Sequence, residues 1–510
     1  MKQYYLGIEF GSTRVKAVLI DGEHRIVKSG DYTWKSSLEN GVWTYHMEDV
    51  QTGLRTAIRN LGELPGAVSA MGISGMMHGY LAFDKDWNLL APFRTWQNTM
   101  TGEAAEQLTA EFGFNIPQRW SIAHLYQAIL NGEAHVKNIA HITTLAGYVH
   151  YLLTGENVLG VGEASGMFPI DSEALDYDAA MLEKFDALIA KYGFAWTARS
   201  VLPKVLTAGQ AAGALTQAGS TFLDGLLSAG IPFCPPEGDA GTGMTATNAV
   251  APRTGNVSAG TSIFAMVVLE KPLSKVYQEI DMVTTPSGKP VAMVHCNNCT
   301  NDMNAWVSLL GETAKLFGAE VSTGELFTKL YQKSLEGDAD CSGVLTYSYM
   351  AGEGLTHLDE GRPMVVRKPE SSFTLANFLR SQLYATMSTL KLGMDILAEE
   401  HVAIDSLTGH GGLFKTPVVG QKYMAAACRA SVTCMESAGE GGPYGMALLA
   451  SYLVQKQDGQ TLEQYLETEI FADVKRTTLA PDPEDEAGFD RYLSWYRSAL
   501  AAENAAVKAF

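Results

Sequence analysis

The stretch that decides the fold lies at residues 4–27 and reads YYLGIEFGSTRVKAVLIDGEHRIV. Residues 4–10 form an apolar run, GSTR follows, and residues 15–20 form a second apolar run. This order predicts a strand, a tight glycine-containing turn and a second strand. P-loops and dinucleotide folds differ, because their glycine turn opens into a helix whose N-terminus holds the phosphates. The stretch is therefore either a phosphate-binding hairpin or an ordinary hairpin that carries the same residues.

The turn of this hairpin contains groups that can bind phosphate. Next to Gly11, the hydroxyls of Ser12 and Thr13 and successive backbone N–H groups line one concavity. Lys16 follows shortly after the turn and can reach a phosphate from the flank. Glu9 precedes the turn and can hold a hydrated Mg²⁺.

The composition describes a large globular protein. A chain of 510 residues, 46% hydrophobic and 18% charged, is too long for one core and predicts two or more domains. The formal net charge of −19, with no basic stripe, argues against nucleic acid or an anionic membrane as partner. We find no signal-peptide pattern and no apolar run of the roughly 20 residues that a membrane-spanning helix requires. The expected location is the cytoplasm.

The cysteines predict no disulfide framework. Six cysteines in a chain of this length are sparse. The stretch HCNNC at residues 295–299 contains a C-x-x-C pair, which occurs in redox sites and as half of a zinc site, but no second pair with zinc spacing follows. We therefore expect Cys296 and Cys299 to be reduced, buried or half-buried thiols.

Two loops in the first half are candidates for contact with a small polar ligand. A predicted strand at residues 67–74 ends in GMMHG, and open α/β sheets bind ligands at strand ends. Met77 and His78 in that loop can present an apolar surface and a ring nitrogen, although a core methionine and a surface histidine explain them equally well. The second loop, RTWQN, contains Trp96 and Asn98, and an aromatic face beside amides suits a sugar.

Asp239 is the candidate acid–base residue. A predicted strand at residues 231–236 ends in two prolines and is followed by EGDAGTG. An aspartate between glycines at such a place is exposed, and the backbone around it can approach a ligand closely. Asp239 can then accept a proton from a substrate hydroxyl. A turn aspartate that satisfies its own backbone is the alternative.

The second half repeats part of this pattern. Residues 255–268 read GNVSAGTSIFAMVV and predict another strand–turn–strand unit. The repetition indicates two duplicated halves that face a shared cleft, with a boundary at about 245–255. Further on, a short predicted strand at residues 406–408 ends in GHGG, where Gly411 and Gly412 can seat an adenine ring.

Helical periodicity and end signals place helices between the predicted strands, which makes the fold class α/β. The predicted helical segments are residues 48–61, a helix from about 101, most of 121–155, then 372–400, 416–427, 444–454 and a C-terminal stretch after 486.

In this order and approximate spacing, the motifs resemble the FGGY carbohydrate kinase family, part of the actin/hexokinase/Hsp70 ATPase superfamily, over nearly the whole chain. The motifs that carry the resemblance are the hairpin at residues 7–20, GMMHG at 75–79, LLTGE at 152–156, IPFCPPEGDAGTG at 231–243, SAGTS at 258–262 and GHGGLFKTP at 409–417. The Met-His loop is most similar to that of the xylulokinases.

The resemblance implies two actin-like, ribonuclease H-like domains, at residues 1–248 and 249–510, with sugar and ATP in the cleft between them. It implies ATP- and Mg²⁺-dependent phosphorylation of a hydroxyl of a small-molecule sugar, with a ketose such as xylulose favoured. A homodimer is possible.

The resemblance also assigns roles to individual residues. Asp239 matches the catalytic base and substrate contact, with Glu9 as its partner in holding the metal. Further substrate contacts are implied at Met77, His78, Trp96 and Asn98. The nucleotide and its phosphates are expected at Gly11, Ser12, Thr13, Lys16, Gly260, Thr261, Gly411 and Gly412.

Two departures from the family pattern keep alternatives open. Glu9 stands where the family normally has Asp, and Asn98 stands where many members carry Asp. The alternatives are a kinase for another ketose, a polyol or a sugar acid such as gluconate, an actin-like ATPase switch that binds a protein partner, and an inactive sugar-binding regulator. The two enzyme readings agree best with the Asp239 and Met-His loops, because a switch requires no acid that activates a hydroxyl.

Overall fold

The computed structural model describes residues 3–435 and 441–509. The chain forms two compact units that interleave along the sequence. The first unit contains residues 1–252, 270–291 and 440–474, and the second contains 253–269, 292–439 and 475–510. These units differ from two uninterrupted blocks at 1–248 and 249–510, because two later segments pack with the first unit.

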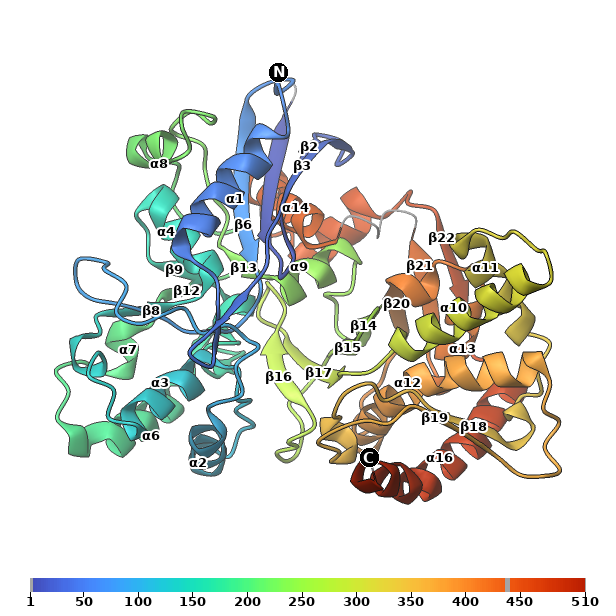
Figure 1. The fold of residues 1–510 in the computed structure, drawn as a ribbon. Helices are drawn as coiled ribbons and strands as arrows, with labels where there is room; N and C mark the ends of the chain where they lie inside the picture. Colours follow the sequence, from blue (N-terminus) through green and yellow to red (C-terminus); the bar gives the residue numbers. More distant parts are fainter. Residues whose placement is uncertain (1–2, 436–440, 510) are drawn as a thin grey trace. The chain divides into compact units, whose positions relative to one another are not determined.

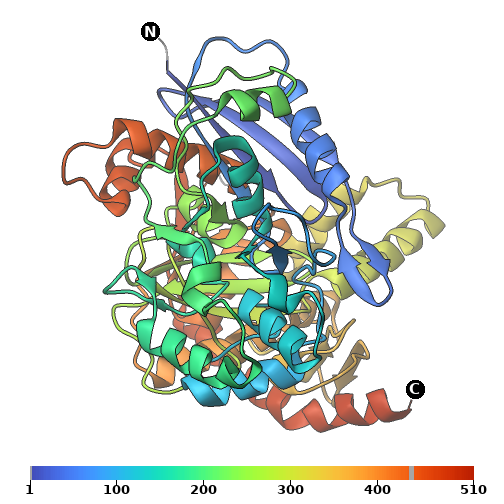
Figure 2. The same cartoon turned by 90° about the vertical axis from the view of Figure 1, so that its left-hand side faces the viewer.

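The first unit is built on a five-stranded sheet with the order β13-β6-β1-β2-β3. The predicted hairpin is confirmed: β1 (Tyr4–Phe10) pairs antiparallel with β2 (Arg14–Asp21), and β2 pairs antiparallel with β3 (Ile26–Thr33). On the other side β1 pairs in parallel with β6 (Val68–Gly75), which pairs in parallel with β13 (Glu237–Gly238). Figure 2 shows β1, β2 and β3 in blue with helix α1 alongside.

Side chains alternate across this sheet, so each face packs on a different helix. Leu6 and Phe10 belong to a core that includes Leu54 of α1 (Met47–Arg59). Gly7 points to the other face, where a β-carbon would collide with the backbone of α14 (Gly441–Gln455). Figure 1 shows α1 and α14 beside the strands β1, β2 and β6. A glycine in β1 thus allows α14 to lie directly on the strand.

The first unit contains further strands and helices that its loops connect. They are β4 (Ser37–Glu39), β5 (Val42–Thr44), β7 (Leu81–Phe83), α2 (Gly102–Phe112), α3 (Ser121–Leu130), β8 (His141–Thr143), α4 (Leu145–Thr154), β9 (Val158–Gly160), α5 (Val161–Ala164), β10 (Ile170–Asp171), β11 (Asp176–Tyr177), α6 (Ala179–Ile189), α7 (Ala198–Val201), β12 (Lys204–Leu206), α8 (Gln217–Phe222), α9 (Asp239–Ala246), β16 (Asp281–Thr284) and α15 (Leu462–Tyr465).

The structure of this unit differs from the expectations in three details. Residues 231–236 form only isolated bridges through Pro232 and Phe233, because prolines cannot donate to a strand ladder. Asp239 begins helix α9 and does not sit in an open turn. The region 121–155 contains the predicted helices, but strand β8 interrupts them.

The second unit has a sheet with the strand order β17-β15-β14-β20-β21-β22. The second predicted hairpin is confirmed as β14 (Thr254–Ala259) paired antiparallel with β15 (Ile263–Val268). Strand β20 (Ser406–His410) pairs in parallel with β14. The relation of β14 to β15 and β20 is therefore the relation of β1 to β2 and β6.

Helices complete the second unit. Helix α12 (Leu375–Glu399) is the long predicted one and is buried along most of its length, whereas α10 (Asn301–Leu316) and α11 (Thr323–Ser334) were not predicted. The other elements are β17 (Pro290–Cys296), β18 (Val344–Tyr347), β19 (Met364–Arg367), α13 (Val419–Cys428), β21 (Ser431–Met435), β22 (Arg476–Leu479) and α16 (Pro483–Ala509). None of the helices within 3–435 and 441–509 is long and apolar enough to cross a membrane.

Candidate active site

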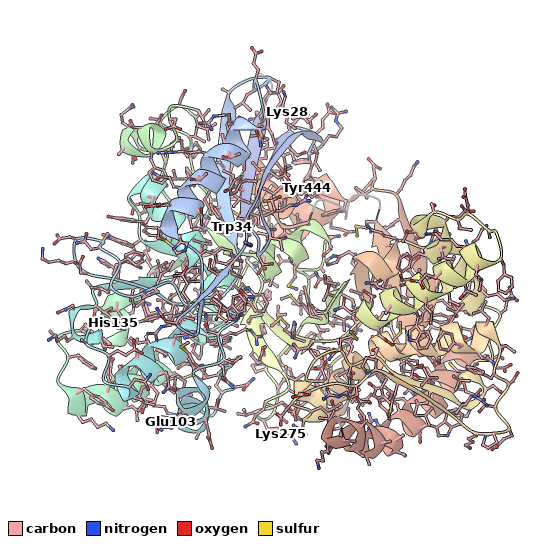
Figure 3. All side chains as sticks on the ribbon, viewed as in Figure 1. Lys28, Trp34, Glu103, His135, Lys275 and Tyr444 are labelled. Atoms are coloured by element: carbon pink, nitrogen blue, oxygen red, sulfur yellow. The ribbon has the colours of Figure 1, made fainter. Side chains whose placement is uncertain are left out.

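The turn between β1 and β2 presents its amides outward. The carbonyl oxygen of Gly11 accepts a hydrogen bond from Trp34 Nε1 at 2.7 Å, and that of Ser12 accepts one from the Tyr45 hydroxyl at 2.7 Å. Trp34 is labelled in Figure 3. Within the described residues, the N–H groups of Ser12 and Thr13 have no acceptor, and both residues are exposed. Carbonyls held inward and amides facing outward form a site for an anion.

Glu9 lies at the end of β1, directly opposite Lys16 in the hairpin register. Its Oε2 is buried without a hydrogen-bond partner in the structured part of the chain and lies so close to Gly442 that a β-carbon there would overlap it. Burial, together with the nearby charge of Asp239, raises the pKa of Glu9 to about 8, although Lys16 and Ser74 oppose the shift. Gly442 of α14 thus leaves room for the longer glutamate side chain.

Glu9 and Asp239 fit a Mg²⁺ ion by the chemistry of their donors. Magnesium in kinases is usually held by one or two carboxylates, with water and substrate phosphates completing its octahedral shell. The orphaned Oε2 of Glu9 and the exposed carboxylate of Asp239 are donors of that kind. No group of three or more His, Cys, Asp and Glu side chains that could hold a metal ion occurs among residues 3–435 and 441–509.

Asp239 is the first residue of α9, and its side chain is exposed. The backbone N–H of Met77 donates a hydrogen bond to Asp239 Oδ1 at 3.2 Å. The dense protein around the carboxyl raises its pKa, while N–H groups, including that of Met77, lower it. These N–H donors stabilise the ionised form, which is the form that can accept a proton.

Two buried acids next to Asp239, Glu163 and Glu237, were not identified in the sequence analysis. Glu237 accepts hydrogen bonds from the N–H groups of Gly162 at 3.4 Å and of Glu163 at 2.9 Å. Burial raises the pKa of Glu237 to about 8 and that of Glu163 well above its ordinary value. Both oxygens of Glu163 are buried without a partner among the described residues, and its carboxyl packs against Gly238. Glu163 belongs to the short helix α5, which contacts α9, the helix that begins with Asp239.

Met77 and His78 form the loop that follows β6. Both side chains are buried, and His78 has a positive φ of 69°. Its Nδ1 lies 3.0 Å from the carbonyl oxygen of Gly166, and its ring stacks on Trp120. Met77 packs on the same glycine and on Gly238. The structure therefore brings the Met-His loop and Asp239 together, as the motif analysis expected.

Trp96 and Asn98 lie in the second candidate loop but differ in exposure. Trp96 is 39% exposed, whereas Asn98 is buried. The Asn98 side chain accepts from the N–H of Trp43 at 2.8 Å and donates to the carbonyl oxygens of Trp43 at 2.8 Å and Thr95 at 3.0 Å. These bonds commit the Asn98 amide to the backbone of β5 and of its own loop. Asn98 therefore holds the loop that carries Trp96 against β5, and its role as a substrate contact stays a prediction.

The second unit contributes backbone. The carbonyl oxygen of Gly260 accepts from the N–H and the hydroxyl of Thr300, and Thr261 next to it is exposed. Gly411 follows β20 with a φ of 95°, and a β-carbon on it would collide with the carbonyl oxygen of Ala259. Gly412 has open space around it. The exposed backbone at these glycines is the kind of surface that a flat ring or a phosphate can approach closely.

The cysteine prediction is confirmed for the C-x-x-C pair. Cys296 and Cys299 are fully buried in the second unit. Burial raises the pKa of Cys299 to about 12 and that of Cys296 well above its ordinary value, so both remain thiols at neutral pH.

Comparison with known proteins identifies the family to which the chain belongs. Two models described as the FGGY family of carbohydrate kinases match the chain, the N-terminal domain at residues 4–245 and the C-terminal domain at 255–454. The chain is 22% identical to a xylulose kinase of Haemophilus influenzae over 96% of this chain and 99% of the relative. It is 27% identical to a glycerol kinase of Thermococcus kodakarensis over 53% of this chain and 54% of the relative.

A solved structure shares the fold. The crystal structure of a gluconate kinase from Lactobacillus acidophilus superposes with a TM-score of 0.80 at 16% identity, covering 99% of both chains. The predicted class, an α/β protein with two actin-like domains, is confirmed.

Proposed function

The chain belongs to the FGGY family of carbohydrate kinases, and we propose that it uses ATP to phosphorylate a hydroxyl of a ketose, with xylulose as the favoured substrate. Kinases of this family transfer a phosphoryl group to an alcohol group of a sugar. The observation that carries the proposal is Asp239, an exposed carboxylate held by the Met77 N–H beside the Met-His loop.

In the proposed reaction, Asp239 accepts the proton of the sugar hydroxyl as that oxygen attacks the γ-phosphorus of ATP. The new O–P bond forms while the bond from the γ-phosphorus to the bridging oxygen breaks, and ADP leaves. Phosphoryl transfer depends chiefly on in-line placement and on neutralising phosphate charge, so a carboxylate of ordinary basicity is sufficient. Mg²⁺, when bound near Glu9 and Asp239, would supply part of that neutralisation.

The phosphate-binding groups are proposed on the same physical grounds. The outward N–H groups of Ser12 and Thr13, with Gly11 and Lys16 beside them, form one anion site in the first unit. Gly260 and Thr261 form the corresponding turn of the second unit, and Gly411 and Gly412 are proposed to lie against the adenine.

The choice of sugar rests on the relatives and on one loop. The full-length relative is a xylulose kinase, and the Met-His loop resembles that branch. The match to a glycerol kinase and the fold shared with a gluconate kinase make a polyol or a sugar acid the second candidate.

The test is an acceptor screen with Mg-ATP. The purified protein is incubated with ketopentoses, ketohexoses, polyols and sugar acids, ADP release is followed, and the phosphorylated product is identified by mass spectrometry. Asp239→Ala is assayed in parallel, with Asp473→Asn, an exposed aspartate of the same unit, as the control.

We expect turnover with one ketose, loss of that turnover in Asp239→Ala and no change in Asp473→Asn. Turnover that survives Asp239→Ala would remove Asp239 from its role. Turnover only with glycerol or gluconate would replace the substrate and keep the mechanism. Binding of sugar or ATP without any turnover would favour the inactive regulator or the ATPase switch.

A further inference from the structure

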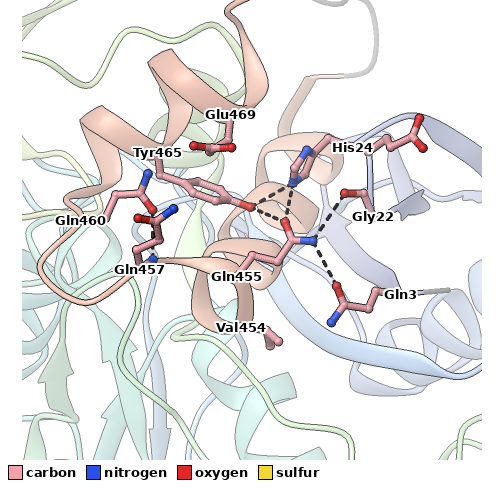
Figure 4. Close-up of a pocket in the computed structure, with 10 residues that line it drawn as sticks. Gln3, Gly22, His24, Val454, Gln455, Gln457, Gln460, Tyr465 and Glu469 are labelled. Carbon is pink, nitrogen blue, oxygen red and sulfur yellow. Dashed lines mark hydrogen bonds between the residues drawn. The ribbon is translucent and has the colours of Figure 1, made fainter. Parts of the chain in front are cut away.

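A polar cavity of about 620 Å³ lies in the first unit, at the end of the β1–β2 hairpin opposite the Ser12–Thr13 turn (Figure 4). Helix α14 connects the two ends of the hairpin, since its first turn lies at Glu9 and its last residue, Gln455, lines the cavity. A helix of 15 residues is about 22 Å long, so the cavity is well separated from Glu9 and from Asp239.

The floor of this cavity is a fixed hydrogen-bond network. His24 Nε2 lies 2.8 Å from Gln455 Oε1 and 2.9 Å from the Tyr465 hydroxyl. That hydroxyl donates to Gln455 Oε1 at 2.8 Å, and Gln455 Nε2 donates to Gln3 Oε1 at 3.2 Å. The Tyr444 hydroxyl, also from α14, donates to the carbonyl oxygen of His24 at 3.3 Å. The side chains are therefore held in place before any ligand arrives.

The wall of the cavity is polar and has no permanent positive charge. Gln457, Gln460 and Glu469 face the space from the segment after α14 (Figure 4). The side-chain amide of Gln457 has no hydrogen-bond partner in the described part of the chain. The lining contains no Lys or Arg among the described residues, and burial lowers the pKa of His24, so the ring is neutral at pH 7.

This chemistry selects a class of ligand. Each amide offers donors and an acceptor, and a carboxylate accepts two hydrogen bonds, so neighbouring hydroxyl groups can be bound in pairs. A phosphate or a nucleotide would find no cation here. The volume is in the range of small-molecule sites, roughly 300–1,000 Å³. We propose that this cavity binds a neutral polyhydroxy compound, a free sugar or a polyol, at a second site separate from the one that contains Asp239.

Hydrogen–deuterium exchange with mass spectrometry tests the proposal without ATP and without any need for turnover. The probes are xylitol, sorbitol, glucose, fructose and xylulose as neutral compounds, with spermidine and inorganic phosphate as charged ones. Two regions are followed separately: peptides covering residues 20–26 and 454–469 report the cavity, and peptides covering 74–80 and 237–246 report the Asp239 site. A failed kinase assay therefore leaves this readout intact.

We expect at least one neutral probe to slow exchange in the cavity peptides. The surface variants Gln457→Ala and Glu469→Gln should weaken that protection about two- to tenfold in midpoint concentration, the effect of one or two hydrogen bonds. Gln332→Ala, an exposed glutamine of the second unit, should leave it unchanged. Protection confined to the Asp239 peptides, protection of the cavity by spermidine or phosphate alone, or no protection of the cavity by any probe would overturn the proposal.

Discussion

The two units repeat one arrangement and use it differently. In each, a hairpin pairs in parallel with a further strand, β6 in the first unit and β20 in the second, and the loop after that strand carries a motif. In the first unit the loop presents Met77 and His78, whereas in the second it presents Gly411 and Gly412.

The difference lies in what surrounds each loop. Buried acids, Glu163 and Glu237, support the first loop and Asp239, while the second loop approaches the backbone of Ala259 so closely that only glycine fits. The first unit therefore offers reactive side chains beside its loop, whereas the second unit offers exposed backbone. A sugar hydroxyl requires the former, and a flat nucleotide base is served by the latter.

The largest expected effect comes from removing the side-chain chemistry of the first unit. Asp239→Asn should lower kcat by about 10²–10⁴-fold, the range for loss of a general base, because the amide cannot accept the proton. Nucleotide affinity and the unfolding temperature should remain close to those of the parent, since Asp239 is exposed. Steady-state kinetics and nucleotide titration measure both. An equal loss of nucleotide affinity would contradict the proposal that the first unit acts on the sugar and the second binds the nucleotide.

The backbone of the second unit is tested by adding one methyl group. Gly411→Ala should destabilise the protein by about 1–3 kcal/mol and weaken nucleotide binding, because the new β-carbon would strike Ala259 and the φ of 95° is strained for alanine. Gly412→Ala is the matched control for the effect on stability, since its β-carbon would lie 4.0 Å from the same carbonyl oxygen. Denaturant unfolding and ADP titration give the two readouts. Equal effects from both changes would contradict the close approach.

The buried polar groups of the first unit should make its stability depend on pH. His124 is fully buried, both ring nitrogens lack partners among the described residues, and burial, with a contribution from Arg94, lowers its pKa to about 3. Below pH 6.5 the His124 imidazole binds a proton in the unfolded chain but stays neutral in the folded chain. The free energy of unfolding therefore falls as the pH drops from 6.5 towards 3, by up to about 1.4 kcal/mol per pH unit.

His124→Phe should reduce this acid dependence in thermal unfolding measured between pH 7 and pH 4. An unchanged slope in His124→Phe would show that His124 is not held neutral.

The smallest effect is expected at Glu163. Its carboxyl is buried without a partner in the described chain, and burial raises its pKa well above the ordinary value, so Glu163→Gln places a neutral amide of similar shape where burial disfavours a charge. We expect a change in unfolding free energy below about 1 kcal/mol. Glu237→Gln should cost more, because the Glu237 carboxyl accepts two backbone N–H groups and a glutamine would turn a donor towards one of them. Chemical denaturation of both variants ranks them, and the reverse order would be inconsistent with this account.

Much of the sheet framework was predictable from the sequence. The strands β1, β2, β14 and β15 lie where the apolar runs and Gly-Ser-Thr or Gly-Thr-Ser turns placed them, because local alternation and turn residues specify a hairpin. The region at residues 231–236 was misjudged, since its apolar residues suggested a strand while its prolines prevent one. Helices α10 and α11 were not predicted, and few of their residues are buried.

The sequence by itself determined the hairpins, the candidate base Asp239 and the family resemblance, because each depends on residues that are close in the chain. Only the tertiary structure decided which distant residues support them. Trp34 and Tyr45 hold the carbonyls of Gly11 and Ser12, Gly442 makes room for Glu9, and Glu237 binds the N–H of Glu163 in the helix next to Asp239. Such contacts join segments far apart in sequence, and no local pattern encodes them, since they arise when strands and helices pack at close range.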